Sequence, residues 1–477
     1  MPTAQPKSQQ SAQKALSTEL FDVLVIGAGV VGCAVARRFT LEGAKVAVVE
    51  KASDILEGAS KANSAILHTG FDAPTGSLEL SCIRAGYREY ERIRDDLGLV
   101  QEKSGAQVVA WTPEEMDKLE EIVAQAHENG VTDVHIVDAN TLRAAEPNLS
   151  ERALGAVNVP QESIIDPWSA PYVYLRQALD NGAQVFLSCA VTGGAFDGQN
   201  WQVETSNGAL RACAVVNCAG LFGDLVDEAV LGEAKFKITP RKGQFVVFDK
   251  AAQGLVNSII LPVPQEKTKG IVLFRTVFGN LAVGPTAEDQ QSRTDASTDH
   301  DTLKGLIADG VDKVPALVDM PVTAVYAGLR PASERKAYRV ETVPDRNWIT
   351  VGGIRSTGLS ASLGIARHVY GLYESHGSKH QQLTDPEKPQ AAVLAQTGER
   401  DWKRAGYGEI VCHCEMVTSR EIEAALNGPL GARSMGGLKR QTRATMGRCQ
   451  GFYCSARLAE LTAGKLEPPL SEEFGHD

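Results

Sequence analysis

Three glycines near the start of the chain constrain its fold most strongly. Gly27, Gly29 and Gly32 have G-x-G-x-x-G spacing, follow the apolar run 23–26 and precede a helical pattern. In such a strand–loop–helix unit the first glycine permits a tight turn, the second lets the backbone approach a pyrophosphate, and the third lets the helix lie close to the strand. The N–H groups at the start of the helix then point toward the phosphates. The pattern predicts a dinucleotide-binding site.

Glu50 supports this prediction. It ends a second apolar strand 18 residues after Gly32. An acidic side chain at this place accepts a hydrogen bond from a ribose 2′-hydroxyl. A carboxylate there disfavours a 2′-phosphate, so the expected ligand is FAD or NAD.

Length and composition limit the alternatives. The 477 residues are 43% hydrophobic, which is enough for about two to four domains. The net charge of −11 argues against a nucleic-acid partner. No apolar run approaches the roughly 18 residues of a membrane helix, and residues 1–20 are polar, without the apolar core of a secretory signal. We expect a disordered tail over 1–20 and a cytoplasmic protein whose nine cysteines stay reduced, with a peripheral membrane contact through a partner left open.

Strand and helix patterns alternate along the chain up to residue 376. A loop over 57–70 is rich in Gly, Ser and Ala, so a cofactor could lie against its backbone. The sequence Asn-Cys-Ala-Gly at 217–220 ends a later strand beside the glycine loop, which implies a nucleotide-binding domain made of discontinuous pieces. The stretch 242–283 alternates like an antiparallel sheet. A final strand, loop and helix occupy 348–376.

Together these motifs resemble the D-amino-acid-oxidase-like flavoproteins, and among them anaerobic-type glycerol-3-phosphate dehydrogenases and L-2-hydroxyglutarate dehydrogenases. The resemblance covers 21–376 and rests on the glycine loop with Glu50 and on the sequences at 63–70, 217–220, 327–331 and 358–361. It implies an α/β fold in which a Rossmann-like FAD domain carries an inserted antiparallel β-sheet substrate domain.

The same resemblance implies domain boundaries. FAD-binding parts are expected at about 21–85, 150–235 and 345–376, and substrate-lobe parts at about 86–149 and 236–344. Residues 377–408 are rich in Gln, Lys, Pro and Ala and are predicted to be a linker. A small α-rich domain is expected at 409–465.

Noncovalent FAD is expected on the glycine loop, on the loop after Glu50 and on the ends of later strands. The segment 357–359 opens a helix and is expected to face the flavin, where the helix dipole stabilises the anionic reduced ring. The residues assigned to the cofactor are Gly27, Gly29, Gly32, Glu50, Ser60, Asn63, Ser64, Val191, Ala219, Gly220, Gly353, Thr357, Gly358 and Leu359.

Three residues are assigned to the substrate. By the resemblance, Arg330 clamps a carboxylate or phosphate, a task that suits a planar guanidinium; an ordinary surface ion pair is the alternative. His68 has a suitable pKa range for accepting a hydroxyl proton, unless it only forms a hydrogen bond near the flavin. Lys242 could add positive charge for a phosphate.

Four cysteines near the C-terminus form two close pairs, Cys412 with Cys414 and Cys449 with Cys454. In a reducing compartment they predict a metal centre before disulfides. The segment 438–451 resembles the second half of bacterioferritin-associated-ferredoxin-type domains, which implies that all four cysteines bind a [2Fe–2S] cluster. Eight Lys and Arg against five Glu over 409–465 give a local charge of +3, which suits an anionic cluster. Zinc remains the alternative, although C-x-C is tight for it.

These assignments predict a FAD-dependent dehydrogenase. A flavin accepts a hydride, and a one-electron cluster then removes the electrons from the reduced flavin one at a time. The expected substrate is a small anionic alcohol, glycerol 3-phosphate first, then an L-2-hydroxy acid, then an amine or imino acid. Electrons would leave through the cluster to a ferredoxin, a quinone-linked protein or a second flavoprotein subunit rather than to oxygen. The alternative from another class is an electron-transfer subunit, which would have no need of Arg330 and His68.

Overall fold

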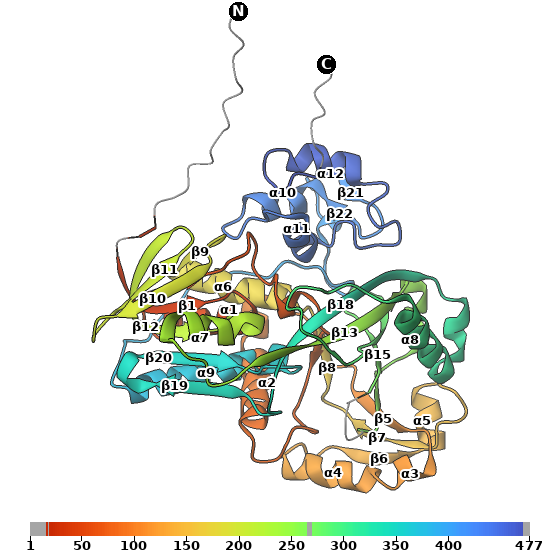
Figure 1. Cartoon of the computed structure of the whole chain (residues 1–477). Coiled ribbons are helices and arrows are strands. Elements are labelled where there is room, and N and C mark those ends of the chain that lie inside the picture. The colour runs from red at the N-terminus through yellow and green to blue at the C-terminus, as the bar shows by residue number, and fades with distance from the viewer. Residues whose placement is uncertain (1–15, 18, 265–269, 471–477) are drawn as a thin grey trace, which may run out of the picture.

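The glycine loop lies at the end of the first strand of an eight-stranded sheet, which we call the FAD sheet (Figure 1). The computed structural model describes residues 16, 17, 19–264 and 270–470. Most of the predicted tail 1–20 is therefore outside the described residues, and Leu20 already begins β1. The FAD sheet consists of β1 (Leu20–Ile26), β2 (Val46–Val49), β9 (Gln184–Phe186), β10 (Val191–Phe196), β11 (Trp201–Thr205), β12 (Gly208–Asn217), β19 (Arg339–Val343) and β20 (Trp348–Gly352).

This sheet is parallel from β12 through β1 and β2 to the edge strand β9, and it is antiparallel where β10, β11 and β19 join it. β1 pairs in parallel with β2 and β12, and β12 with β20. Because helices cover both faces, the central strands are almost continuously buried, as in β2, whose four residues are all buried. One face packs on a layer of four helices, which are α1 (Val30–Leu41), α2 (Leu78–Leu97), α6 (Ser169–Asp180) and α9 (Gly358–Ser375). The short α7 (Gly223–Leu231) covers the other face.

A nine-stranded sheet forms the second layer, which we call the substrate sheet. It is mostly antiparallel, as predicted, with one parallel pair between β5 and β14. Its longest pairing joins β13 to β18 over the whole length of both strands. The strands are β5 (Ala106–Ala110), β6 (His135–Asp138), β7 (Gly155–Val159), β13 (Ile238–Phe248), β14 (Ile259–Pro262), β15 (Val272–Arg275), β16 (Leu281–Gly284), β17 (Glu288–Asp289) and β18 (Val322–Ser333).

Shorter elements complete the two layers. A three-stranded sheet connects them through β3 (Ile66–Leu67), β4 (Gln101–Glu102) and β8 (Ser163–Ile165). The helices that accompany the substrate sheet are α3 (Pro113–Met116), α4 (Leu119–Glu128), α5 (Ala139–Ala145) and α8 (His300–Lys313). None of the helices in the described residues is long and apolar enough to cross a membrane.

Packing and strand pairing move three of the predicted boundaries. The first FAD part runs to the end of α2, because α2 packs along α9. The second begins after β8 rather than at 150, because β7 pairs with β5 and β6 in the substrate sheet. The third begins at β19 rather than at 345, because β19 pairs with β20.

The C-terminal domain has its own small core. It contains β21 (Ile410–Cys412), β22 (Val417–Thr418), α10 (Ser419–Asn427), α11 (Met435–Thr442) and α12 (Ser455–Thr462). The predicted capping box at the start of α10 is present: the Thr418 hydroxyl accepts from Glu421 N, and the Glu421 carboxylate accepts from Thr418 N. Val417, Ile422 and Leu458 are fully buried in its core.

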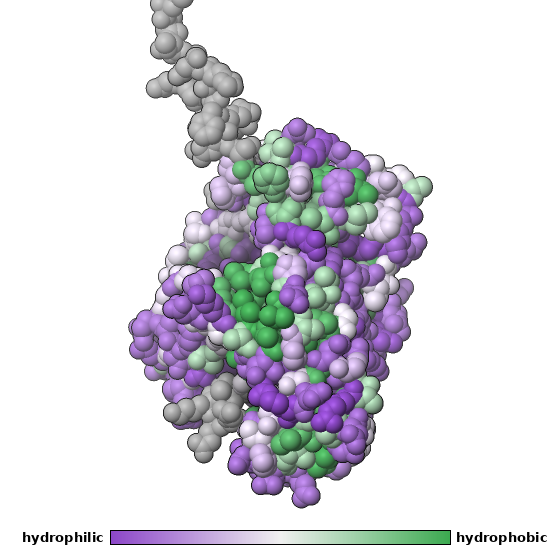
Figure 2. All heavy atoms as spheres, turned by 90° about the vertical axis from the view of Figure 1, so that its right-hand side faces the viewer, coloured by the Kyte–Doolittle hydropathy of each residue, from purple (hydrophilic) through white to green (hydrophobic). Residues whose placement is uncertain are grey.

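Polar contacts dock this domain on the rest of the molecule. Arg448 forms a two-point ion pair with Asp249, Lys250 Nζ lies 3.2 Å from Glu415 Oε2, and the backbone N–H of Arg433 donates to Asp54. Figure 2 shows hydrophilic residues along the junction between the C-terminal domain and the body. Charged and polar contacts therefore help to dock the domain, beside Leu430, which packs in the hydrophobic cluster of the FAD part.

The predicted linker 377–408 follows the surface of both layers. Backbone N–H groups of Leu383, Ala391 and Gln396 donate to Leu41, Leu97 and Val277, respectively. Leu394 and Ala395 are fully buried. The segment connects the domains and is also anchored along its length.

Candidate functional site: a cavity between the sheets and a cysteine cluster

A cavity of about 840 Å³ lies between the FAD sheet and the substrate sheet. Most of the predicted cofactor and substrate residues line it, although they come from six separate parts of the chain. These lining residues are Gly27, Gly29, Glu50, Ser60, Asn63, Ser64, His68, Val191, Ala219, Gly220, Arg330, Gly353, Thr357, Gly358 and Leu359. Gly32 and Lys242 are not among them.

The glycine loop leaves no room for side chains. Gly27 has φ +97°, and a Cβ there would lie 2.8 Å from the Cys218 carbonyl oxygen. A Cβ at Gly32 would overlap the carbonyl oxygen of Gly27. Gly32 therefore acts as expected for the third glycine of the motif: it brings α1 close to β1 and does not itself face the ligand.

Glu50 fixes the conformation of this loop. Its two carboxylate oxygens accept from the backbone N–H groups of Ala28 (2.8 Å) and Ala52 (2.9 Å). Burial raises the pKa of Glu50, and these two hydrogen bonds oppose the rise. The Glu50 carboxylate therefore lies at the cavity, and its hydrogen bonds with the loop both orient the carboxylate and support the loop.

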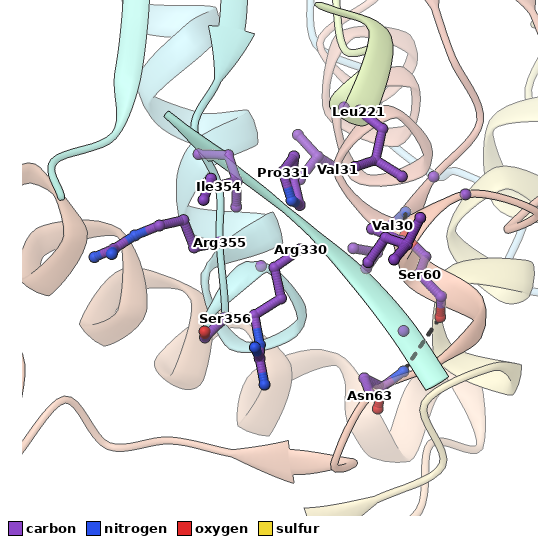
Figure 3. A pocket seen from close by; sticks show the side chains of 18 of the residues that line it. Val30, Val31, Ser60, Asn63, Leu221, Arg330, Pro331, Ile354, Arg355 and Ser356 are labelled. Atoms are coloured by element: carbon purple, nitrogen blue, oxygen red, sulfur yellow. Dashed lines mark hydrogen bonds between the residues drawn. The ribbon is translucent and has the colours of Figure 1, made fainter. Parts of the chain in front are cut away.

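Ser60 and Asn63 fold the next loop over the start of α1. The Ser60 hydroxyl accepts from Val30 N at 3.0 Å, and Asn63 Nδ2 donates to the Ser60 carbonyl at 3.2 Å (Figure 3). A Cβ on Gly29 would lie 3.1 Å from Ser60 Oγ. The approach to this helix N-terminus is therefore bounded by small groups only.

The start of α9 offers donors at the other end of the cavity. Thr357 precedes the helix, but its hydroxyl contacts Tyr338 and Glu79 instead of capping it. Within the described hydrogen bonds, the backbone N–H groups of Gly358 and Leu359 have no acceptor. Two helix N-termini thus face one cavity, one suited to a pyrophosphate and one to an anionic ring. FAD fits this donor set.

His68 has a buried partner that the sequence analysis missed. His68 Nδ1 lies 2.8 Å from Glu162 Oε2, and Glu162 is fully buried. The backbone N–H of His68 donates to Ser360 Oγ, which fixes the residue against α9. Only the register of β3 with β8 brings residue 162 beside residue 68, and no local motif indicates such a pairing.

Arg330 enters the cavity from β18 among other cations (Figure 3). Its Nη2 donates to the Thr286 carbonyl at 3.0 Å. Burial first, then the charges of Arg241 and Arg355, lower the pKa of Arg330 to about 10, so it stays charged at neutral pH. Gly243 gives it room, because a Cβ there would lie 2.5 Å from Nη2.

Lys242, which the sequence analysis assigned to the substrate, does not line the cavity. Side chains alternate along β13, so that Arg241 and Gly243 line the cavity and Lys242 points to the opposite face. There it lies close enough to Asp295 and Asp299 to act on their charges. Sequence reasoning missed several cavity cations, among them Arg241 and Arg355. Strand alternation was the available indication for Arg241.

The four C-terminal cysteines approach one another as two pairs. Cys412 interacts with Cys454 and Cys414 with Cys449, so each pair combines one cysteine from each sequence motif. Among the described residues no three His, Cys, Asp or Glu side chains are gathered tightly enough to hold a metal ion. The donor set is nevertheless four thiols on two facing loops, which is the ligand chemistry of a [2Fe–2S] cluster.

The main chain around Cys449 already favours an anionic sulfur. Hydrogen bonding from the backbone of Tyr453 is the largest cause that lowers the pKa of Cys449, whereas burial raises the pKa of Cys454 to about 11. Between these two cysteines, the side chains of Phe452 and Tyr453 are 81% and 78% exposed. The cysteine site is therefore close to the molecular surface.

Comparison with known proteins agrees with both sites. Residues 22–372 match the FAD dependent oxidoreductase family, and residues 410–463 match the BFD-like [2Fe-2S] binding domain. A glycerol 3-phosphate dehydrogenase of Caloramator mitchellensis is 32% identical over 95% of this chain and 96% of its own length. An anaerobic glycerol-3-phosphate dehydrogenase subunit of Escherichia coli K12 is 23% identical over 94% of this chain and 89% of its own length.

A solved structure shows the same fold for the body of the molecule. The L-alpha-glycerophosphate oxidase of Mycoplasma pneumoniae with FAD bound has a TM-score of 0.72 and 25% identity, over 78% of this chain and 99% of its own. The family predicted from the motifs, its fold and both cofactors are confirmed. The chain belongs to the FAD dependent oxidoreductases and carries a BFD-like [2Fe-2S] binding domain behind the flavoprotein part.

Proposed function

We propose that the chain oxidises the secondary hydroxyl of glycerol 3-phosphate to a ketone and passes the electrons on through its [2Fe–2S] cluster. The observation that carries the choice of substrate is the group of guanidiniums at the cavity. The names of the relatives from Caloramator mitchellensis and Escherichia coli support the same substrate.

The arginine group suits a phosphate dianion. Arg330 is buried, and the charges that act on it within the described residues are the cations of Arg241 and Arg355 rather than a carboxylate. Arg241 is compensated by Asp289 at 2.6 Å, and the charge of Glu79 acts on Arg355, so the least compensated charge is that of Arg330. A phosphate monoester carries a charge of about −1.5 to −2 at neutral pH. One phosphate group can therefore pair with Arg330 and a neighbouring guanidinium together, whereas each carboxylate of a hydroxy acid neutralises one guanidinium.

The remaining chemistry is divided between cofactor and protein. FAD, when bound, supplies the two-electron acceptor that takes the hydride. His68 lines the same cavity and can take the hydroxyl proton. Arg330 and Arg355 hold the phosphate, and the substrate sheet excludes water from the reacting carbon.

A redox partner follows from the cluster and from the similarity to one subunit of the Escherichia coli enzyme. We propose that a separate protein accepts electrons one at a time near the exposed Phe452 and Tyr453, in a reducing, cytoplasmic setting.

The test is anaerobic bleaching of the flavin by single compounds. Glycerol 3-phosphate should bleach it at micromolar to millimolar concentration, and glycerol and L-2-hydroxyglutarate should be at least about tenfold less effective. Bleaching by a 2-hydroxy acid or an amino acid, with none by glycerol 3-phosphate, would reject this substrate. Failure of every compound would favour an electron-transfer role for the chain.

A further inference from the structure

We propose that Glu162 is a positioning residue for His68: its carboxylate holds the proton of the imidazole on Nδ1, so that Nε2 is the basic nitrogen presented to the substrate hydroxyl. The inference rests on the proposed function in taking His68 as the proton acceptor. It adds a residue that lies behind the cavity rather than in its lining.

Both carboxylate oxygens of Glu162 have hydrogen-bond partners. Oε1 accepts from the backbone N–H of Thr69 at 2.7 Å and from the Thr69 hydroxyl at 2.9 Å. Oε2 lies 2.8 Å from His68 Nδ1. A buried carboxylate is costly unless its hydrogen bonds are satisfied, and here one of those bonds ends on a group that faces the cavity.

The backbone holds this pair in place from both sides. In the β3–β8 register Leu67 pairs with Ser163, so residues 68 and 162 are the next opposite positions. The His68 N–H donates to Ser360 Oγ at 2.9 Å, and the Glu162 carbonyl accepts from Gly105 N at 2.9 Å. Both residues therefore lie directly beside paired strands, and neither lies at the tip of a flexible loop.

A fixed acceptor on Nδ1 decides the direction of proton transfer. A carboxylate cannot donate, so Nδ1 must carry the hydrogen, and in the neutral imidazole Nε2 then has the lone pair. During oxidation the hydroxyl proton would move to Nε2, FAD, when bound, would accept the hydride of the carbinol carbon, and a ketone would remain. The imidazolium so formed lies against the negative carboxylate, which stabilises it.

Another glutamate provides a matched control. Glu146 is also buried, and its carboxylate has three hydrogen-bond partners, as that of Glu162 has: the backbone N–H groups of Asn257 and Ser258 and the Ser258 hydroxyl. It is not part of the cavity lining. Glu146→Gln therefore changes a buried carboxylate of the same kind without touching a histidine.

The experiment compares Glu162→Gln with Glu146→Gln. The amide introduced by Glu162→Gln can still accept from Thr69 but must donate to Nδ1, which moves the imidazole proton to Nε2. We expect Glu162→Gln to lower kcat by about 100-fold or more, the usual contribution of a general base, with FAD content unchanged and KM within about threefold. Glu146→Gln should keep kcat within about threefold.

Nitrogen-15 NMR gives a readout that does not depend on turnover. The chain has nine histidines, and His68 is assigned by the signal lost in His68→Gln. We expect a proton on Nδ1 in the wild type and on Nε2 in Glu162→Gln. A wild-type proton on Nε2, or equal kcat in Glu162→Gln and wild type, would overturn the inference, and the wild-type NMR result decides if the variant fails to fold. If glycerol 3-phosphate does not bleach wild-type flavin, the proposed substrate fails separately and kcat is measured with the compound that does.

Discussion

The FAD cavity and the cysteine site bind their cofactors in opposite ways. At the cavity the backbone forms the binding surface: Gly27 has φ +97°, a Cβ on Gly32 would overlap a carbonyl, and the N–H groups of two helix starts are presented to the ligand. At the cysteine site four side chains form it, from loops that hold them as two thiol pairs.

The difference teaches where each site is vulnerable. A cavity made of main chain is enclosed between two sheets and is blocked by adding an atom. A site made of thiols lies near the surface, beside the exposed Phe452 and Tyr453, and is abolished by exchanging a single sulfur. The first site therefore suits a cofactor that meets the substrate, and the second a cofactor that meets another protein.

The largest effect is expected from adding bulk to the main-chain site. Gly29→Val places a branched side chain against Ser60 Oγ, which already lies 3.1 Å from the position of a Cβ, and should prevent FAD from being retained. The measurement is flavin per chain after gel filtration. Gly371→Val on α9 is the control, because a Cβ there meets nothing within 4 Å; normal flavin content in Gly29→Val would remove this glycine from the site.

Replacing one cluster cysteine should remove the cluster without affecting the FAD site. Cys449→Ser leaves three thiols, so iron and sulfide should fall to background while FAD content stays at the wild-type level. Cys213→Ser, a half-buried thiol of the FAD sheet, should lose neither. Flavin lost together with the iron would show that the sites are not independent, and zinc in place of iron in the wild type would contradict the cluster.

A smaller effect is expected from the substrate half of the cavity. Arg330→Ala should leave both cofactors in place but cost about 2–4 kcal/mol in binding of the anionic substrate, about 30- to 1000-fold in kcat/KM. Steady-state kinetics with glycerol 3-phosphate measure it. Lys242→Ala is the natural comparison, since Lys242 lies on the opposite face of β13; equal losses in both variants would argue against the arginine site.

The smallest effect concerns the contact between the two regions. Hydrogen bonding from Arg448 lowers the pKa of Asp249 to about 2, and the Arg448 side chain is 68% exposed. Solvent screening therefore limits the pair to about 1 kcal/mol or less. The contribution should be fully present above the unfolded-state pKa of about 3.9 and disappear as the pH falls through about 2.

The check is the difference in urea midpoint between wild type and Arg448→Ala. It should be small at pH 7 and shrink steadily below about pH 4. A difference that grows on acidification would have the wrong sign for an ion pair of this kind.

Sequence reasoning predicted the parts that depend on local chemistry. Gly27, Glu50 and the four cysteines are recognisable because their roles require one residue type at one spacing. Glu162, Arg241 and Arg355 are not, since each reaches its partner through strand register or a loop between distant segments. Lys242 was misplaced for the same reason: neighbouring residues of a strand point to opposite faces, and only the observed pairing shows which one faces the cavity.

The most direct test of the account is an EPR spectrum taken after anaerobic addition of glycerol 3-phosphate, in parallel with the flavin absorbance. In the wild type the flavin should bleach and the signal of a reduced [2Fe–2S] cluster should rise, whereas Cys449→Ser should show bleaching without that signal. Wild-type flavin that stays oxidised, or bleaches while an intact cluster remains EPR-silent, would contradict the path from substrate through FAD to the cluster.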